Sequence, residues 1–186
     1  MTTRRSVLST ADVRRPVVAA AALRQFARGG FHRTTVADVA QDAKISPAYV
    51  FKLFPRKEAL FTAALELCFD EIDATLVRGV DEAEEQTPTA ILDAMGAAYA
   101  ELISDRDLLM LQVHAQSASE VPEIGAALRA GIQRITQTAQ SRSGAAPEDV
   151  QRFLAYGQLC HLIVTIGLTD STEPWAELIT RGIRHP

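Results

Sequence analysis

Residues 30–60 read GFHRTTVADVAQDAKISPAYVFKLFPRKEAL and hold two short helical patterns separated by only a few residues. The second pattern opens at Ser46-Pro47, which places a capping hydroxyl directly before a proline at the first helical position. Pro55 ends that pattern within three turns, because proline cannot continue a helix. Two helices of about eight residues, joined by a turn of three or four, are typical of a helix-turn-helix.

The first helix of this pair is predicted to begin at Thr35, whose hydroxyl can cap it together with Asp38 at the third helical position. Lys44-Ile45 forms the turn between the helices. The buried stripe of the first helix is expected to consist of Val36, Val39, Ala40 and Ala43. The apolar anchors of the second are expected to be Val50, Phe51 and Phe54.

Upstream of the pair, residues 1–9 are polar and without periodicity, and we expect a disordered arm there. A further helix is predicted to start near Arg15, because Pro16 fits the first turn of a helix and not its interior. Gly29-Gly30 is predicted to stop that helix, since glycine accepts the left-handed conformation of a helix end. Residues 10–56 therefore form one predicted domain, built around the helix-turn-helix.

Downstream of the pair, apolar residues recur at helical spacing to the end of the chain, and no run alternates with the period of a strand. The predicted helices cover residues 56–79, 88–102, 104–117, 122–144 and 148–169, with a short last helix opened by Pro174. The predicted fold class is all-α with about nine helices. It comprises a three-helix head and a helical body, residues 57–186.

Composition narrows the class of protein. An apolar fraction of 47% and a charged fraction of 23% suit a soluble globular protein. The longest apolar run, residues 153–168, is too short to span a membrane, and no signal peptide pattern opens the chain. The two cysteines lie far apart and form no pair of metal ligands. We therefore expect a cytoplasmic protein with no membrane partner, no metal and no cofactor.

Charge is distributed unevenly along the chain. Residues 1–60 hold 11 Lys and Arg against 4 Asp and Glu, whereas the remaining residues hold 8 against 19. A basic end on an acidic body is expected when one end of a protein meets a polyanion. Chance clustering of charge is the alternative interpretation.

The pattern around residues 30–60 resembles the N-terminal signature of the TetR family of bacterial repressors. The residues that carry the resemblance are Gly30-Phe31, Thr34-Thr35-Val36, Val39-Ala40, Ala43, Ile45-Ser46, Phe51, Phe54-Pro55 and Lys57-Glu58-Ala59-Leu60. The resemblance implies a DNA-binding head, a long connecting helix, and a body that dimerises and holds a small ligand. It also implies a homodimer on a palindromic operator, released when an effector binds.

The sequence departs from the family signature at three positions. Lys44 stands where glycine is usual, so its backbone can be held at positive φ at a cost of about 1 kcal/mol. Phe51 replaces the usual tyrosine and has no hydroxyl to offer a phosphate. Arg56 replaces a small cap residue, and it can reach a phosphate although it cannot cap.

The resemblance places the second helix of the pair in the major groove, where N-terminal residues read bases. Pro47, Ala48 and Tyr49 would then meet base edges, with the apolar pair against a thymine methyl. Because this set has few hydrogen-bonding side chains, DNA shape is expected to supply part of the specificity. The predicted phosphate contacts are Thr35 and Ser46 at helix N-termini, with Lys52 and Lys57 beside them. For Lys52 and Lys57 the alternative is a solvated helix face, and for Arg4 and Arg5 that alternative is preferred.

The body supplies the two remaining predicted sites. Residues 148–169 are too apolar all round to face water, so they are the predicted dimer interface, with burial in the monomer core as the alternative. The interface residues are Phe153, Tyr156, Gly157, Cys160, Val164 and Gly167. A small apolar or weakly polar effector is expected in a pocket lined by Phe69, Met95, Tyr99, Met110, Val113 and His114, although core packing also explains each of these residues. Gln112, His114 and Gln116 are the polar groups available to orient it.

Three classes of function remain. A ligand-responsive repressor is the first, and a DNA-binding activator or architectural protein without effector is the second. A helical-bundle enzyme is the third and least favoured, because no paired Glu-x-x-His motif, phosphate loop or nucleophile elbow occurs. No catalytic residue is therefore predicted.

Overall fold

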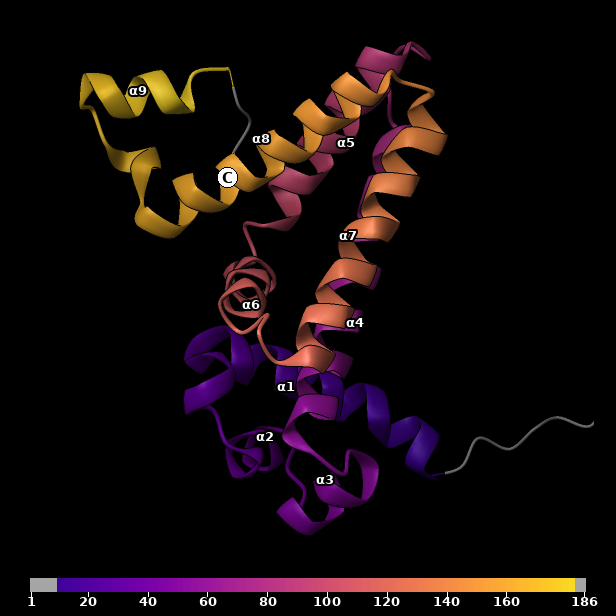
Figure 1. The fold of residues 1–186 in the computed structure, drawn as a ribbon, viewed down its shortest axis with the longest axis vertical. Coiled ribbons are helices and arrows are strands. Elements are labelled where there is room, and N and C mark those ends of the chain that lie inside the picture. The colour runs from indigo at the N-terminus through magenta and orange to yellow at the C-terminus, as the bar shows by residue number, and fades with distance from the viewer. Residues whose placement is uncertain (1–9, 183–186) are drawn as a thin grey trace, which may run out of the picture.

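The computed structural model describes residues 10–182, and every regular element among them is helical (Figure 1). The predicted all-α fold is confirmed. The elements are α1 (Thr10–Arg33), α2 (Val36–Asp42), α3 (Pro47–Leu53), α4 (Lys57–Asp81), α5 (Pro88–Leu102), α6 (Arg106–Ser117), α7 (Pro122–Ser143), α8 (Pro147–Ile166), a 3₁₀ turn η1 (Leu168–Asp170) and α9 (Pro174–Thr180). The predictions for residues 1–9, including Arg4 and Arg5, lie outside the described residues.

Helix α1 begins earlier than its sequence predicts. It starts at Thr10 and carries Pro16 in its interior, so the predicted start near Arg15 is wrong. One lost backbone hydrogen bond near an exposed helix end is a local cost, and the packing of α1 on the rest of the molecule offsets it. The predicted interruption of the helix by glycine is confirmed for one of the two glycines. Gly30 alone leaves the helical conformation, with φ 68° and ψ 176°, and a last turn follows it to Arg33.

The capping residues of the helix pair act as predicted. Thr35 and Asp38 form a reciprocal capping box at the start of α2. The Ser46 hydroxyl accepts a hydrogen bond from the Tyr49 N–H at the start of α3. Lys44 takes φ 55° in the turn, as expected from its departure from glycine. These local signals fix the relative placement of α2 and α3.

The body is a bundle in which α4 packs against both α5 and α7, and α8 lies along α5 (Figure 1). Helix α4 extends from the head far into the bundle. Helix α6 crosses between the two parts and packs mainly against α1 of the head. Helix α9 stands away from the end of the bundle in Figure 1. Among the described residues, no helix is both long and apolar enough to cross a membrane.

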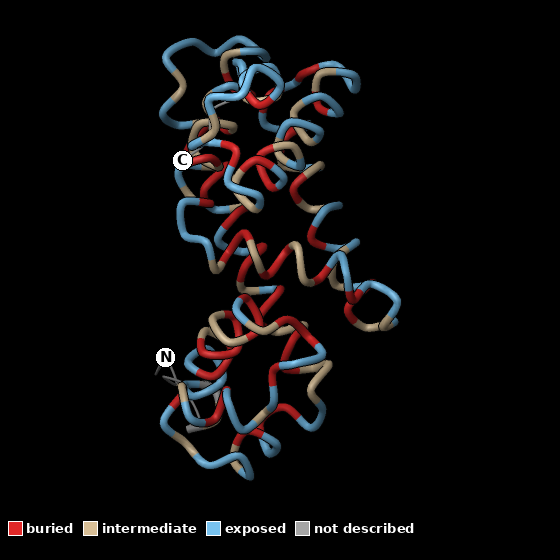
Figure 2. The backbone as a smooth tube through the Cα atoms, turned by 90° about the vertical axis from the view of Figure 1, so that its left-hand side faces the viewer, coloured by how far each residue is buried: buried red, intermediate tan, exposed pale blue. Residues whose placement is uncertain are grey.

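One apolar core runs through head and body, and buried backbone continues between them in Figure 2. At the junction the ring of Phe61 on α4 meets the rings of Phe26 and Phe31 on α1, with centroids 4.8 and 5.5 Å apart. Edge-to-face aromatic pairs of this kind add about 1 kcal/mol each beyond the area that they bury. The head is therefore joined to the body by packing as well as by the chain.

Candidate DNA-binding surface and ligand cavity

Helix α3 presents an exposed face on the outside of the head. Pro47, Ala48, Phe51 and Lys52 are exposed there, while Tyr49 is half-buried against the core. The prediction that Phe51 anchors the helix is wrong, because 49% of its surface is exposed. Val50, Leu53 and Phe54 fill the inward face at i, i+3 and i+4, and helical geometry turns residue 51 away from them. The exposed ring of Phe51 thus lies on the same surface as the residues predicted to read bases.

The hydroxyl of Thr35 is engaged within the head. It donates to Asp38 Oδ2 over 2.7 Å and accepts from the Asp38 N–H over 3.2 Å. The backbone N–H of Thr35 also donates to Asp38 Oδ2, at 2.7 Å, and these bonds hold the pKa of Asp38 below its usual value. A DNA phosphate at this helix start would meet a carboxylate, so the predicted phosphate contact of Thr35 has a competitor.

Lys57 joins the start of α4 to the end of α1. Its Nζ donates to the His32 carbonyl oxygen over 3.2 Å and lies 4.8 Å from the centre of the Phe31 ring. Partial burial lowers the pKa of Lys57. Lys52, by contrast, is an exposed side chain on α3. The two predicted phosphate-binding lysines therefore differ: one also holds the fold together, and the other does not.

Lys52→Ala is expected to leave the melting temperature nearly unchanged and to reduce the salt dependence of DNA binding by about one counterion. Lys57→Ala is expected to lower the free energy of unfolding by about 1 kcal/mol, because it removes a hydrogen bond and a cation–π contact that are partly exposed. Thermal unfolding and DNA titrations at several salt concentrations measure both effects. Equal melting temperatures for the two variants would contradict this division of roles.

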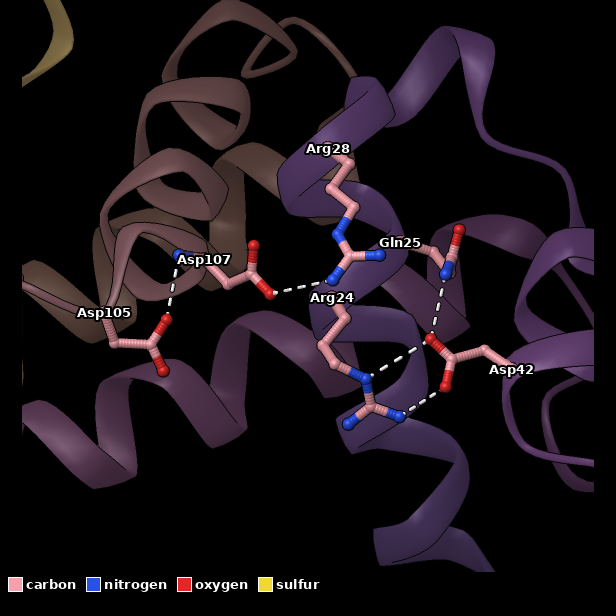
Figure 3. A network of polar contacts seen from close by, with 6 residues as sticks. All are labelled: Arg24, Gln25, Arg28, Asp42, Asp105 and Asp107. Carbon is pink, nitrogen blue, oxygen red and sulfur yellow. Dashed lines mark hydrogen bonds and ion pairs between the residues drawn. The ribbon is translucent and has the colours of Figure 1, made fainter.

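A polar network surrounds α1 at the junction of head and body (Figure 3). Arg24 donates two hydrogen bonds to the carboxylate of Asp42 on α2, from Nη2 to Oδ1 over 2.5 Å and from Nε to Oδ2 over 3.3 Å. Gln25 Nε2 donates to the same Oδ2 over 2.8 Å. The Arg24 guanidinium keeps the pKa of Asp42 below its usual range. One turn further along, Arg28 lies 3.9 Å from Asp107 of α6. Helix α1 thus contacts the helix-turn-helix on one side and α6 on the other, a connection that the sequence did not indicate.

A cavity of about 460 Å³ lies in the body between α4, α5, α7 and α8. Its volume falls within the usual range of small-molecule sites. Most of its wall is apolar, with Leu92, Ile135 and Phe153 contributed by three different helices. Asp93, Asp149 and Arg152 are the charged residues along its lining. Among the described residues, no group of three His, Cys, Asp or Glu side chains could hold a metal ion.

Of the six residues predicted to line the pocket, Tyr99 alone is part of this cavity wall. Phe69 and Met95 are buried in the main core. Met110 and Val113 pack beside Ile103 and Leu109 in a smaller cluster. Their assignment to the pocket is therefore wrong, and core packing, the alternative interpretation, describes them.

His114 has a different position from the one predicted. Its ring packs against Gly30, so closely that a Cβ added to Gly30 would lie 3.1 Å from His114 Nδ1. Because α6 crosses to the head at this point, the side chain faces α1 and not the cavity. Gln112, one turn away on the same helix, does line the cavity.

The predicted interface residues of α8 lie mostly on the side that faces the body. Phe153, Tyr156, Gly157 and Cys160 are part of the cavity lining. Val164 packs beside the smaller apolar cluster, and Gly167 ends the helix with φ 70°. The face of α8 turned to solvent carries other apolar residues, Leu162 and Ile166, which are 47% and 57% exposed, and Tyr156 of the predicted interface is also 50% exposed. Because α8 is apolar all round, its sequence pattern could not distinguish the two faces.

A buried polar group stands at the inner end of the cavity. Tyr99 Oη lies 2.5 Å from His161 Nε2, and it lies 3.5 Å from Gln112 Oε1. Gln112 and His161 are only 3% and 4% exposed. Burial lowers the pKa of His161 to about 4 and raises that of the Tyr99 phenol, so both side chains are neutral at pH 7.

His161 is expected to make folding stability depend on pH in the acid range. An unfolded histidine takes up a proton near pH 6.5, whereas the folded one does so near 4, so the unfolded state binds more protons between these values. Stability therefore falls as pH drops from 6.5 to 4, by up to about 3 kcal/mol. Urea unfolding across this range should show a shallower decline for His161→Gln than for the wild type; parallel profiles would contradict the assignment.

Comparison with known proteins gives a consistent result. Residues 18–64 match the family described as bacterial regulatory proteins, tetR family. The chain is 26% identical over 103 residues to YuxN of Bacillus subtilis (strain 168), an uncharacterized HTH-type transcriptional regulator, and this match covers 55% of the chain and 35% of YuxN.

Two of the solved structures that resemble this chain match it over nine-tenths of its length. A TetR-family transcriptional regulator from Agrobacterium tumefaciens has a TM-score of 0.67 at 18% identity, covering 92% of this chain and 96% of that one. The regulator FadR from Bacillus subtilis, in complex with stearoyl-CoA, has a TM-score of 0.68 at 15% identity, covering 90% and 98%. At these identities the likeness is one of fold.

Proposed function

The match of its head assigns the chain to the tetR family of bacterial regulatory proteins. From this premise we propose that the protein is a ligand-responsive transcriptional repressor. It binds a palindromic operator as a homodimer in the cytoplasm and leaves it when a small molecule fills the body. One observation carries the proposal: α6 contacts the head through Asp107 and His114, while its Gln112 lines the cavity.

DNA binding is supported by the exposed face of α3. A recognition helix enters the major groove and contacts bases with its N-terminal residues. Pro47 and Ala48 are exposed at that end, and Phe51 and Lys52 extend the surface by one turn. The first 60 residues carry 11 basic side chains against 4 acidic ones, which favours a polyanionic partner.

Release by an effector follows from the contacts of α6. A ligand that displaces Gln112 moves the helix whose Asp107 lies beside Arg28 and whose His114 packs on Gly30. Arg24, on the same α1 helix, holds Asp42 of the helix-turn-helix. The ligand shifts the equilibrium only if it binds the released conformation more tightly than the DNA-bound one. FadR, which shares the fold and was solved with stearoyl-CoA, supports an effector site in a body of this kind.

Dimerisation is supported by apolar side chains left exposed on α8 and α9. Leu162 and Ile166 lie on one face of α8, and Trp175 and Leu178 on α9 are also exposed. A two-fold axis pairs such a surface with itself, and two heads then read two half-sites. This surface takes the place of the interface predicted from the sequence.

Leu162→Ala is expected to weaken the dimer about 30-fold, because each copy loses an apolar side chain from the interface. Val164→Ala is the matched control, since Val164 packs inward beside Ile103 and Leu109. It should lower the stability and leave the dimer dissociation constant unchanged. Sedimentation equilibrium measures both constants, and the opposite ranking would restore the interface predicted from the sequence.

Selection of random double-stranded DNA by the purified protein tests the proposed function. A repressor of this kind should enrich a palindrome, with half-sites on one face of the duplex. Small apolar compounds that raise the melting temperature should then release the selected DNA. Enrichment without a palindrome would favour an architectural protein, and release by no stabilising compound would contradict the effector role. In vitro transcription from a promoter that carries the site distinguishes repression from activation.

A further inference from the structure

We propose that the cavity selects uncharged, mainly apolar molecules that carry a hydroxyl group, such as phenols and alcohols, and that Gln112 and Tyr99 read this hydroxyl. The inference rests on the proposed effector role of the cavity and narrows it to one chemical class. Two features support the proposed ligand class: the charged residues that line the cavity, and the hydrogen bonds that Gln112 and Tyr99 can still form with a ligand.

The charge of the wall excludes acidic ligands. Arg152 is the lining cation among the described residues, and its Nη1 already lies 3.0 Å from Asp149 Oδ1. Asp93 adds a further carboxylate, and Arg152 is the one cation beside it in the lining that the structure describes. A phosphate, a carboxylate or a coenzyme A group entering here would lose hydration and find no unpaired cation among the described lining residues. The ligand class of FadR is therefore not expected to carry over to this chain.

The inner end of the cavity offers an acceptor that the protein itself does not satisfy well. Gln112 Nε2 donates to the Leu108 carbonyl oxygen over 3.2 Å, which fixes the direction of the amide, and it also donates to Tyr99 Oη over 3.4 Å. Gln112 Oε1 is then left with Tyr99 Oη at 3.5 Å, a distance at the limit of a hydrogen bond. Because a buried acceptor without a good partner is unfavourable, a ligand that donates to Oε1 gains binding free energy.

The Tyr99 hydroxyl completes a site for a group that both donates and accepts. If Tyr99 donates to His161 Nε2, its oxygen keeps a lone pair for a ligand donor. If His161 donates instead, the Tyr99 O–H is available to a ligand acceptor. A ligand hydroxyl finds a partner in both tautomers: in the first, its single proton goes to Tyr99 Oη or to Gln112 Oε1, and in the second it accepts from Tyr99 while it donates to Gln112 Oε1. An ether or a ketone can only accept, so it leaves the Gln112 acceptor unsatisfied.

Three probes of matched shape test the inference on the full chain: 4-phenylphenol, 4-methoxybiphenyl and biphenyl-4-carboxylate. Isothermal titration of the DNA-free protein at pH 7.5 should give the phenol about tenfold higher affinity than the ether, since one hydrogen bond differs. The carboxylate should bind at least about 100-fold more weakly than the phenol, because its charge is desolvated without a partner.

Two glutamine variants supply the internal control. Gln112→Leu removes the acceptor and should make the phenol and the ether bind equally. Gln158→Leu makes the same change at another lining glutamine, which pairs with Gln116 at 2.9 Å, and should keep the tenfold preference. If Gln112→Leu does not fold, the relative affinities of the wild type for the three probes still test the proposed ligand class.

Each outcome has one meaning. Equal affinities of the wild type for the phenol and the ether would overturn the hydroxyl assignment and leave the effector role standing. Tightest binding of the carboxylate would overturn the uncharged class. Binding of none of the probes would overturn the inference, and the compound screen for operator release would then decide separately whether the effector role survives.

Discussion

Ala48→Glu is expected to raise the dissociation constant for operator DNA more than about 100-fold while leaving the fold intact. Ala48 is exposed on α3, so a glutamate there is not forced into the core of the head. In the complex it would place a carboxylate between the phosphate backbones of the major groove. Like charges brought together in an interface cost several kcal/mol, and 2.8 kcal/mol corresponds to about 100-fold.

Ala130→Glu is the matched control for this variant. Residue 130 is also an exposed alanine within a helix, on α7 of the body, so the net charge changes equally. Charges more than a Debye length from the DNA are largely screened at physiological salt. The control should therefore bind the operator within about twofold of the wild type.

Fluorescence anisotropy with a labelled operator measures both dissociation constants, and circular dichroism verifies that both variants are folded. If both variants bind DNA as tightly as the wild type, α3 is not the helix in the groove. The proposed regulator would then have to read DNA with another surface. Losses of equal size in both variants would indicate a general charge effect.

The fold was predictable wherever one short segment decides it. Ser46-Pro47 and Thr35 with Asp38 mark helix starts through hydrogen bonds within a single turn, so their neighbours in sequence are sufficient. Lys44 at φ 55° was predictable for the same reason. Pro16 misled the prediction, because the packing of α1 on the body outweighs a local preference.

The cavity was not predictable to the same extent, because it depends on which faces of distant helices meet. Tyr99, Met95 and His114 all have the spacing of an inward stripe, yet they lie at the cavity, in the core and against the head. Apolar residues occur on every side of α8, so Phe153 and Cys160 gave no sign that they face the cavity. A single sequence reports that a residue is inside but not what it contacts.

The contacts of Lys57 show the same limit within the head. A lysine in the first turn of a helix is unfavourable for the helix, which indicated a DNA contact. The bond from its Nζ to the His32 carbonyl joins residues 25 positions apart and has no sequence pattern. The basic charge of the head was predictable, whereas the division of that charge between DNA and fold was not.

Gly131→Ala is expected to lower the free energy of unfolding by about 3 kcal/mol, the upper end of the usual cost of overpacking. A Cβ at residue 131 of α7 would lie 2.1 Å from Cδ2 of Phe69 on α4. The Phe69 ring is 1% exposed and cannot move aside into solvent. The added methyl group therefore forces α4 and α7 apart or pushes the ring off its rotamer. Gly96→Ala is the control: its Cβ would lie 3.8 Å from Phe153, an ordinary contact, and alanine favours the helix.

Phe69→Leu should restore much of the stability lost in Gly131→Ala, because a shorter side chain makes room for the new methyl group. The interaction energy of the double-mutant cycle, measured by urea unfolding, is expected to exceed about 1 kcal/mol. Additive effects would mean that the ring and residue 131 do not touch. A positive cycle would establish Phe69 as the spacer that sets how closely α4 and α7 approach. Phe69, which the sequence predicted to line the pocket, would then affect the cavity indirectly, through the width of the bundle around it.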